Sequence, residues 1–167
     1  PRSLVLPRNQ WRGDYLDVCR GAGIIAFRGN QNSFIYAPRS ERAQTNLFIR
    51  ALRLIDQYVP LFGSHTSRDE DMKKTHPRNI RASLFLRPYS RRLAFLEPLR
   101  IWRITRAMTH AGTQGETFHL WWHPHNFGRD IEENLRTLET ILKHFAGLRD
   151  RYGMQSVSMG KRAELLS

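Results

Sequence analysis

Histidine and tryptophan cluster in the segment His-Leu-Trp-Trp-His-Pro-His, which holds residues 119–125. Imidazole exchanges protons near neutral pH and also binds metal ions, so such a cluster can serve either chemistry. On an ideal strand His119, Trp121, His123 and His125 would share one face, although the proline before His125 is expected to end that alignment. Three interpretations stay open: a zinc site made by the three histidines, a hydrogen-bonded strand end, and a histidine that acts as a general acid beside an apolar pocket.

An arginine follows each of three short apolar runs: Arg8, Arg28 and Arg87. The planar guanidinium can orient a carboxylate or hold an anionic group of a substrate, and a surface ion pair is the alternative for any one of them. Further residues could contact a sugar through amides or rings, with turn chemistry and core packing as the alternatives: Asn9, Asn30, Asn126, Trp11, Trp121 and Trp122.

Short apolar runs alternate with helical patterns along the chain. Strands are predicted at residues 3–6, 24–27, 83–86 and 117–122, with a last short strand at 154–159. Helices are predicted at residues 12–22, 43–58, 97–111 and 131–149, and a long loop or insertion at 60–79. This alternation predicts a parallel α/β sheet or barrel, in which chemistry lies beyond the C-terminal ends of the strands. We therefore expect the three arginines and the histidine segment to converge.

The helix predicted at 131–149 has the clearest pattern. Apolar residues recur at helical spacing and are expected to form its buried face: Ile131, Leu135, Leu138, Ile141, Leu142, Phe145 and Leu148. Asp130 and Glu133 have the spacing of a capping box, and Gly153 is expected to end the helix. Pro98 suits the first turn of the preceding helix.

The composition is that of a folded domain with a strong positive charge. The chain has 167 residues, enough for one domain, and 40% of them are hydrophobic. Lys and Arg number 27 against 15 Asp and Glu, which gives a net charge of +12. Such a charge suits nucleic acid, but no zinc-finger spacing or aromatic RNA-binding signature accompanies it. No apolar run approaches the roughly 18 residues of a transmembrane segment. The single cysteine, Cys19, excludes a disulfide framework.

Four motifs resemble the later motifs of the NodB-homology polysaccharide deacetylases, carbohydrate esterase family 4. They are Leu-Pro-Arg-Asn-Gln at 6–10, Phe-Arg-Gly-Asn at 27–30, Phe-Leu-Arg-Pro at 85–88 and Phe-His-Leu-Trp-Trp-His-Pro-His-Asn-Phe-Gly at 118–128. The resemblance implies an α/β fold that is a portion of a distorted (β/α) barrel with about seven strands. Residues 1–167 would be the C-terminal part of a single deacetylase-like domain, with the N-terminal part upstream. The implied activity is a metal-dependent hydrolysis that removes N-acetyl groups from a polysaccharide or a lipid-linked amino sugar.

The resemblance also implies roles for single residues. His123 would act as the general acid, with His125 as the competing candidate, and Arg8 would orient the aspartate that serves as the base. The expected substrate-binding residues are Trp121, Trp122, Arg28, Arg87 and Asn126.

Enzymes of this family use a divalent metal, usually zinc, held by an aspartate and two histidines of early motifs. Those motifs and the base aspartate are not found in this sequence. The metal ligands are therefore expected upstream, no metal ligand is assigned within the chain, and the chain alone is expected to be inactive. The expected partner is a carbohydrate and not a nucleic acid. Two rival hypotheses are a non-catalytic carbohydrate-binding domain on the same fold and a basic nucleic-acid-binding protein.

Overall fold

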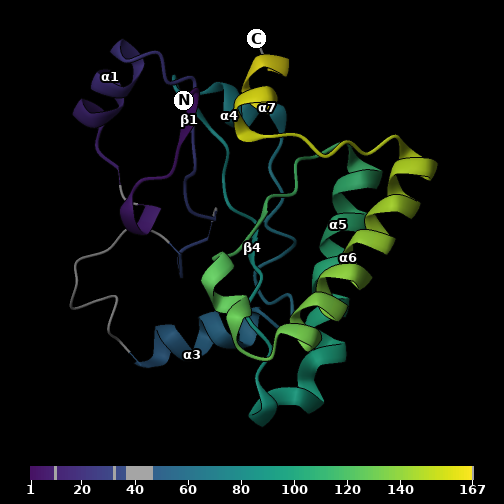
Figure 1. The fold of residues 1–167 in the computed structure, drawn as a ribbon. Coiled ribbons are helices and arrows are strands. Elements are labelled where there is room, and N and C mark those ends of the chain that lie inside the picture. Colours follow the sequence, from purple (N-terminus) through teal and green to yellow (C-terminus); the bar gives the residue numbers. More distant parts are fainter. Residues whose placement is uncertain (10, 32, 37–46, 167) are drawn as a thin grey trace.

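The computed structural model describes residues 1–9, 11–31, 33–36 and 47–166, except for the side chain of Arg8. Within these ranges, strands and helices are interleaved along the chain (Figure 1). The strands are β1 (Ser3–Leu4), β2 (Ala26–Phe27), β3 (Arg78–Asn79), β4 (Leu84–Phe85) and β5 (Leu120–Trp121). The α-helices are α1 (Gly13–Gly21), α3 (Leu47–Asp56), α4 (Asp69–Lys73), α5 (Glu97–Gln114), α6 (Ile131–Tyr152) and α7 (Met159–Leu165). Short 3-10 helices cover Pro7–Asn9, Arg91–Leu96 and Pro124–Gly128.

The five named strands pair in parallel, and within the described residues one isolated antiparallel bridge joins Ser67 to Thr117. One sheet has the order β1-β2-β3, and the other pairs β4 with β5. The two sheets share one extended segment, residues 78–86, which contains both β3 and β4. The N–H of Ala82 in this segment donates to the carbonyl of Gly29, whereas the N–H of Ser83 donates to that of His119. The segment thus changes partner between Ala82 and Ser83, and the C-terminal ends of the paired strands lie toward the same side.

The predicted barrel portion with about seven strands is wrong. The described chain has five short strands in two small parallel sheets. A barrel requires every strand to pair on both sides, but among the described residues β1 pairs only with β2 and β5 only with β4. The apolar runs located the strands correctly and overstated their length, because residues such as Ile24 and Leu86 are buried beside the two-residue ladders without extending them.

Two further predicted segments differ from the structure. The predicted loop at 60–79 contains α4 and β3, and Met72 of α4 is completely buried. The strand predicted at 154–159 is absent from this described part of the chain. In its place an irregular stretch leads into α7, where the Ser158 hydroxyl accepts a hydrogen bond from the backbone N–H of Lys161 at 3.2 Å.

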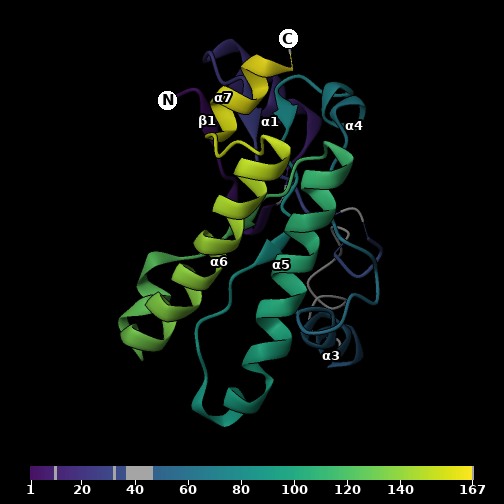
Figure 2. The ribbon, with the colours of Figure 1, turned by 90° about the vertical axis from the view of Figure 1, so that its right-hand side faces the viewer.

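The main apolar core lies between the β4-β5 sheet and two long helices. α5 and α6 run side by side, as both views show (Figures 1 and 2). The buried residues of this core come from β4, the residues that follow it and the two helices: Leu84, Leu86, Ile104, Ala107, Met108, Ile141 and Leu148. A smaller cluster joins α7 to the other sheet through Ala26, Met72, Ile80, Ala163 and Leu166. An ion pair between Arg2 and Glu164 accordingly places the two ends of the chain near each other.

α6 buries only part of the face that its apolar pattern predicts. Ile141 and Leu148 are buried in the main core, and Leu138 and Phe145 pack against it. Its buried residues are Asn134, Thr137, Ile141 and Leu148. Ile131, Leu135 and Leu142 belong to the predicted face, yet their exposed fractions are 54%, 52% and 54%. Asn134 is buried on this helix instead, where its side chain accepts the N–H of Tyr89 at 2.7 Å and donates to the carbonyl of Arg129 at 2.8 Å.

The expected helix ends are confirmed in two of three cases. Gly153 ends α6 with φ of 67°, in the left-handed region that favours glycine, and Pro98 lies in the first turn of α5. The capping box at Asp130 is wrong. Asp130 has φ of 50°, caps no backbone N–H with its side chain, and forms an ion pair with Arg91 at 2.8 Å.

Candidate functional site

A cavity of about 440 Å³ lies at the C-terminal ends of the parallel strands. Three residues that the sequence singled out from separate motifs line it: Arg28 after β2, Arg87 after β4 and His123 after β5. Trp121 and Asn9 also line it. The expected convergence of the strand ends is therefore present for these residues. We call this cavity the strand-end pocket.

Arg28 is held in the strand-end pocket by two neighbours. Its Nε donates to Asn9 Oδ1 at 3.0 Å, and its guanidinium carbon lies 4.2 Å from the ring centroid of Trp121. Partial burial lowers the pKa of Arg28 through desolvation. The stacking joins the end of β2 to β5, so the position of one strand end depends on the other.

His123 extends from the end of β5 and is exposed to solvent. Its ring meets Trp121 edge-on with centroids 5.4 Å apart, and it stacks on His125 with centroids 5.2 Å apart. His125 lies in the next 3-10 helix and does not line the strand-end pocket. His123 could therefore contact a ligand in the strand-end pocket, whereas His125 stacks on the His123 ring from outside the pocket lining.

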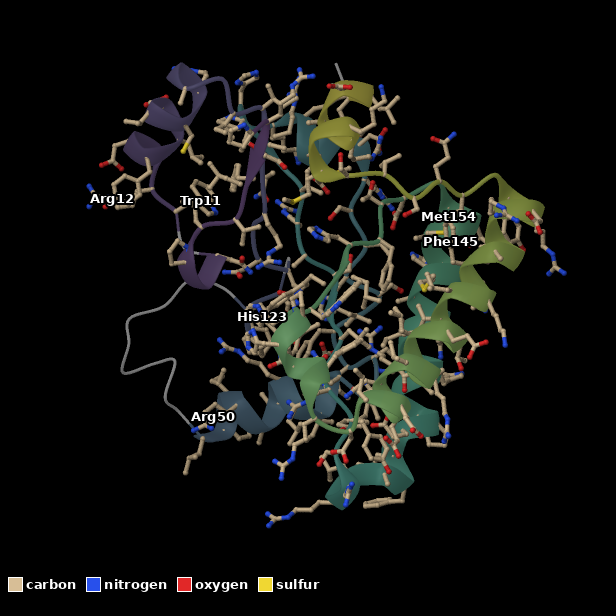
Figure 3. The ribbon with its side chains drawn as sticks, viewed as in Figure 1. Trp11, Arg12, Arg50, His123, Phe145 and Met154 are labelled. Carbon is tan, nitrogen blue, oxygen red and sulfur yellow. The ribbon has the colours of Figure 1, made fainter. Side chains whose placement is uncertain are left out.

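His119 and Trp122, which flank β5, do not line the strand-end pocket. His119 and Trp122 line a different cavity of about 630 Å³, bounded by α5, α6 and the segment before α7. Trp122 stacks on Phe127 at an interplanar angle of 15°. Figure 3 shows Phe145 and Met154, which line this second cavity, at the helix pair and away from His123.

His119 has the environment of a structural histidine. Burial is the largest cause that lowers its pKa, so the neutral ring is favoured. Its Nδ1 lies 3.3 Å from the carbonyl oxygen of Ile80, and its backbone N–H donates to Ser83 Oγ at 2.9 Å. These bonds fix β5 against the shared segment 78–86.

Two of the other predicted site residues cannot be placed in the strand-end pocket. Asn126 lies in the 3-10 helix after β5 and does not line the strand-end pocket. The side chain of Arg8 lies outside the described part of the chain. Arg87 is anchored through its backbone, because its carbonyl accepts a hydrogen bond from the buried side chain of Arg100, which also pairs with Glu97.

Helix α3 contributes pocket residues that the sequence analysis did not single out. Arg50 and Arg53 line the strand-end pocket, together with Tyr36 and Gln57. Arg53 Nε donates to the carbonyl of Ile35 at 2.6 Å. The spacing of three between the two arginines puts them on one helical face, a signal that was present in the sequence. Which face would meet the strand ends could not be read from that spacing.

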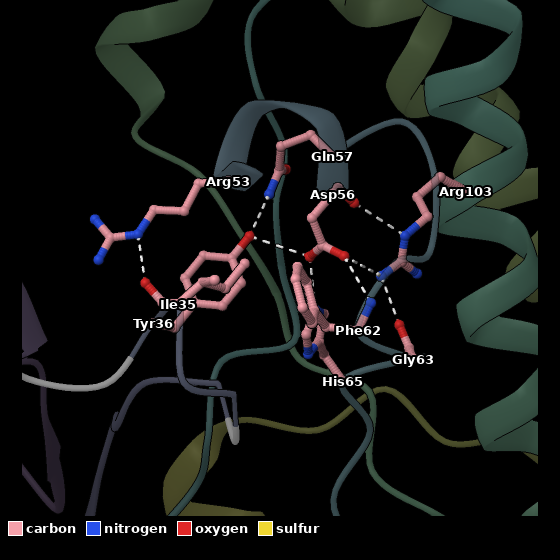
Figure 4. A network of polar contacts seen from close by, with 9 residues as sticks. All are labelled: Ile35, Tyr36, Arg53, Asp56, Gln57, Phe62, Gly63, His65 and Arg103. Atoms are coloured by element: carbon pink, nitrogen blue, oxygen red, sulfur yellow. Dashed lines mark hydrogen bonds and ion pairs between the residues drawn. The ribbon is translucent and has the colours of Figure 1, made fainter. Parts of the chain in front are cut away.

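A buried polar network supports this wall of the pocket (Figure 4). The carboxylate of Asp56 is fully buried and lies 2.7 Å from His65 Nε2 and 3.9 Å from Arg103 Nη2. It also accepts hydrogen bonds from the Tyr36 hydroxyl at 3.2 Å and from the Phe62 N–H at 3.3 Å. Burial and the nearby Asp56 raise the pKa of Tyr36 well above its usual range. The network thus fixes the hydroxyl of a pocket-lining tyrosine.

The described residues do not fit a metal site. No group of three or more His, Cys, Asp or Glu side chains within them could hold an ion. The zinc interpretation of His119, His123 and His125 is therefore not supported, since His119 lines a different cavity from His123. In the same ranges of the chain, no helix is both long enough and apolar enough to cross a membrane.

Comparison with known proteins leaves the family open. No protein-family model, no curated protein and no solved structure matches this chain.

Proposed function

We propose that the strand-end pocket is part of the substrate site of a hydrolase that removes N-acetyl groups from an amino sugar in a polysaccharide or lipid-linked glycan. One observation carries the proposal: Arg28, Arg87, Trp121 and His123, which come from three separate deacetylase-like motifs, line one cavity.

His123 is the proton donor in this proposal. Hydrolysis of the amide adds the oxygen of water to the acetyl carbon and breaks the bond from that carbon to the sugar nitrogen. The nitrogen must gain a proton to leave as an amine, and an imidazolium at the pocket edge can supply it. His123 suits this step because its ring is exposed and lies against Trp121.

The same pocket can hold the sugar. Trp121 and Phe85 provide aromatic surface, with ring centroids 4.5 Å apart, and Asn30, Gln31 and Gln57 provide amides for hydroxyl groups. The residues that activate the attacking water are not among these. The pocket lining contains no carboxylate, so a base and metal ligands would have to come from residues outside the described chain.

The second candidate is a carbohydrate-binding domain without catalytic activity. The absence of a carboxylate from the pocket lining among the described residues favours it. Both candidates predict that the protein binds the glycan, and only the hydrolase predicts that it releases acetate.

An acetate-release assay separates them. The full protein, supplied with zinc or cobalt, is incubated with N-acetylated oligosaccharides and with the same oligosaccharides lacking acetyl groups. The proposal predicts acetate only from the acetylated set and a matching amount of free amine. Binding of the oligosaccharides by folded protein with no acetate release would reject the hydrolase and retain the binding domain.

A further inference from the structure

Four arginines converge on the strand-end pocket from three parts of the fold. Arg28 follows β2, Arg87 follows β4, and Arg50 and Arg53 come from α3. His123 adds a fifth group that can carry positive charge, and no Asp or Glu belongs to the lining. Figure 3 shows His123 and Arg50 on the same side of the helix pair. The pocket therefore concentrates cationic groups in one concave site.

Among the described residues, these four arginines have no carboxylate partner, unlike several arginines elsewhere in the protein. Arg68, Arg91 and Arg162 each pair with a carboxylate. Within the described ranges, no carboxylate lies within ion-pair distance of Arg28, Arg50, Arg53 or Arg87. Contacts to Arg28 and Arg53 come from a neutral amide and a backbone carbonyl. Such contacts orient a guanidinium, and none of them supplies a negative charge.

The fixed orientations leave donors free for a ligand. Arg28 uses its Nε on Asn9 and one face of its guanidinium on Trp121. Arg53 uses its Nε on Ile35, and its guanidinium carbon lies 5.8 Å from the ring centroid of Tyr36. Because a guanidinium has five N–H donors, several remain on each of the two side chains. Pre-ordered donors bind an anion with little loss of side-chain entropy.

We propose that the strand-end pocket binds a phosphate group, so that the substrate is an amino sugar that carries a phosphate ester. A phosphate monoester brings three acceptor oxygens and a charge of about −1.5 to −2, which matches several guanidinium groups better than the single charge of a carboxylate. The assignment of the attached group as an amino sugar rests on the proposed function. Phosphate binding by the arginines does not.

Calorimetric titration of the full protein tests the phosphate site at constant ionic strength. The probes are inorganic phosphate, an N-acetylhexosamine 1-phosphate and the neutral N-acetylhexosamine. We expect the sugar phosphate to bind at least about tenfold more tightly than the neutral sugar, in line with charge-assisted hydrogen bonds. Equal affinities for the two sugars would overturn the proposal.

Matched arginine variants locate the site. Arg50→Gln and Arg53→Gln should each weaken binding of the sugar phosphate about fivefold or more, with little effect on the neutral sugar. Arg151→Gln makes the same charge change at an exposed position of α6 and should bind like the wild type. Arg50 is exposed, so its variant should keep the fold even where Arg53→Gln does not. Unchanged affinity in a folded Arg50→Gln variant would contradict the proposal.

A further binding comparison distinguishes a soluble sugar phosphate from a lipid-linked one. The N-acetylhexosamine 1-phosphate is offered free in solution and as its polyprenyl phosphodiester, which has one negative charge, in neutral vesicles. Tighter binding to the vesicles assigns a lipid-linked substrate, equal or weaker binding assigns a soluble sugar phosphate, and binding of neither form rejects the phosphate site. Phosphate binding without acetate release would leave this inference standing and reject only the hydrolase.

Discussion

The guanidinium of Arg28 stacks on the indole of Trp121, with 4.2 Å between the guanidinium carbon and the ring centroid. This contact joins the residue after β2 to a residue of β5, and the two strands belong to different sheets. The strand-end pocket therefore depends on a tertiary contact between its own lining residues.

Arg28→Lys should destabilise the protein by about 1–2 kcal/mol, because lysine retains the charge and loses both the Nε hydrogen bond to Asn9 and the planar stacking. Urea unfolding measures the change. Arg12→Lys is the matched control, since Arg12 also lies over an aromatic ring, that of Tyr15 at 5.6 Å, and its side chain is 73% exposed. Equal effects of the two substitutions would show that the Arg28 contact contributes nothing of its own.

Asp56→Asn should cost about 3 kcal/mol or more in the free energy of unfolding. The substitution removes the negative charge next to the buried Arg103 and weakens the contacts with Tyr36 and His65. Glu139→Gln, which removes an exposed carboxylate from its pair with Lys143, should leave the urea midpoint unchanged. Unfolding of Asp56→Asn at the wild-type midpoint would show that the buried carboxylate does not stabilise the fold.

The raised pKa of Tyr36 predicts a loss of stability in alkaline solution. In the unfolded chain the phenol loses its proton at pH near 10, whereas in the folded protein it keeps the proton to higher pH. The folded state then binds more protons, so the free energy of unfolding falls as pH rises above about 10. Tyr36→Phe should make this decline shallower between pH 9 and about 11.

Tyr15→Phe provides the comparison for that experiment, because Tyr15 is 53% exposed. Its alkaline decline should equal that of the wild type. Parallel declines for wild type and Tyr36→Phe would show that the Tyr36 phenol is not held protonated by its burial beside Asp56.

Gly29→Ala should destabilise the protein by about 1–3 kcal/mol, since a Cβ at this position would overlap the buried side chain of Asn79. Gly147→Ala is the opposite case. Nothing lies within contact of a Cβ there, and the position is inside α6, so alanine should stabilise by up to about 1 kcal/mol. Thermal unfolding distinguishes the two, and an unchanged melting temperature for Gly29→Ala would contradict the close approach of Gly29 to the Asn79 side chain.

The sequence predicted the strand ends because their signals are local. An apolar run that stops at a polar residue marks the end of a buried strand, and Arg28, Arg87 and His123 each follow such a run. Parallel pairing then brings the ends together whatever the number of strands. The three residues therefore line one pocket even though the predicted barrel was wrong.

Helix orientation was harder to predict because it depends on contacts between distant residues. Leu135 and Leu142 fit an apolar stripe and are exposed, whereas Asn134 is buried and its side chain accepts a hydrogen bond from the N–H of Tyr89. Likewise Arg50 and Arg53 reach the pocket only because α3 packs beside the strand ends. A single sequence contains no local signal for either arrangement.

The buried network also lay beyond sequence reasoning. Asp56 and Arg103 are separated by 47 positions and meet only in the folded chain, and His65 reaches Asp56 from a loop. A histidine or a carboxylate in a polar stretch reads as a surface residue, because burial of a charged side chain requires partners that the sequence does not identify.

The most direct test of the central claim compares His123→Ala with His125→Ala in acetate release by the full protein. We expect His123→Ala to slow release by about a hundredfold or more, as loss of a general acid does, and His125→Ala to remain within a few-fold of the wild type. Metal content should be equal in all three proteins. Equal activity of His123→Ala and the wild type, or a larger loss in His125→Ala, would contradict the assignment of the strand-end pocket as the reacting site.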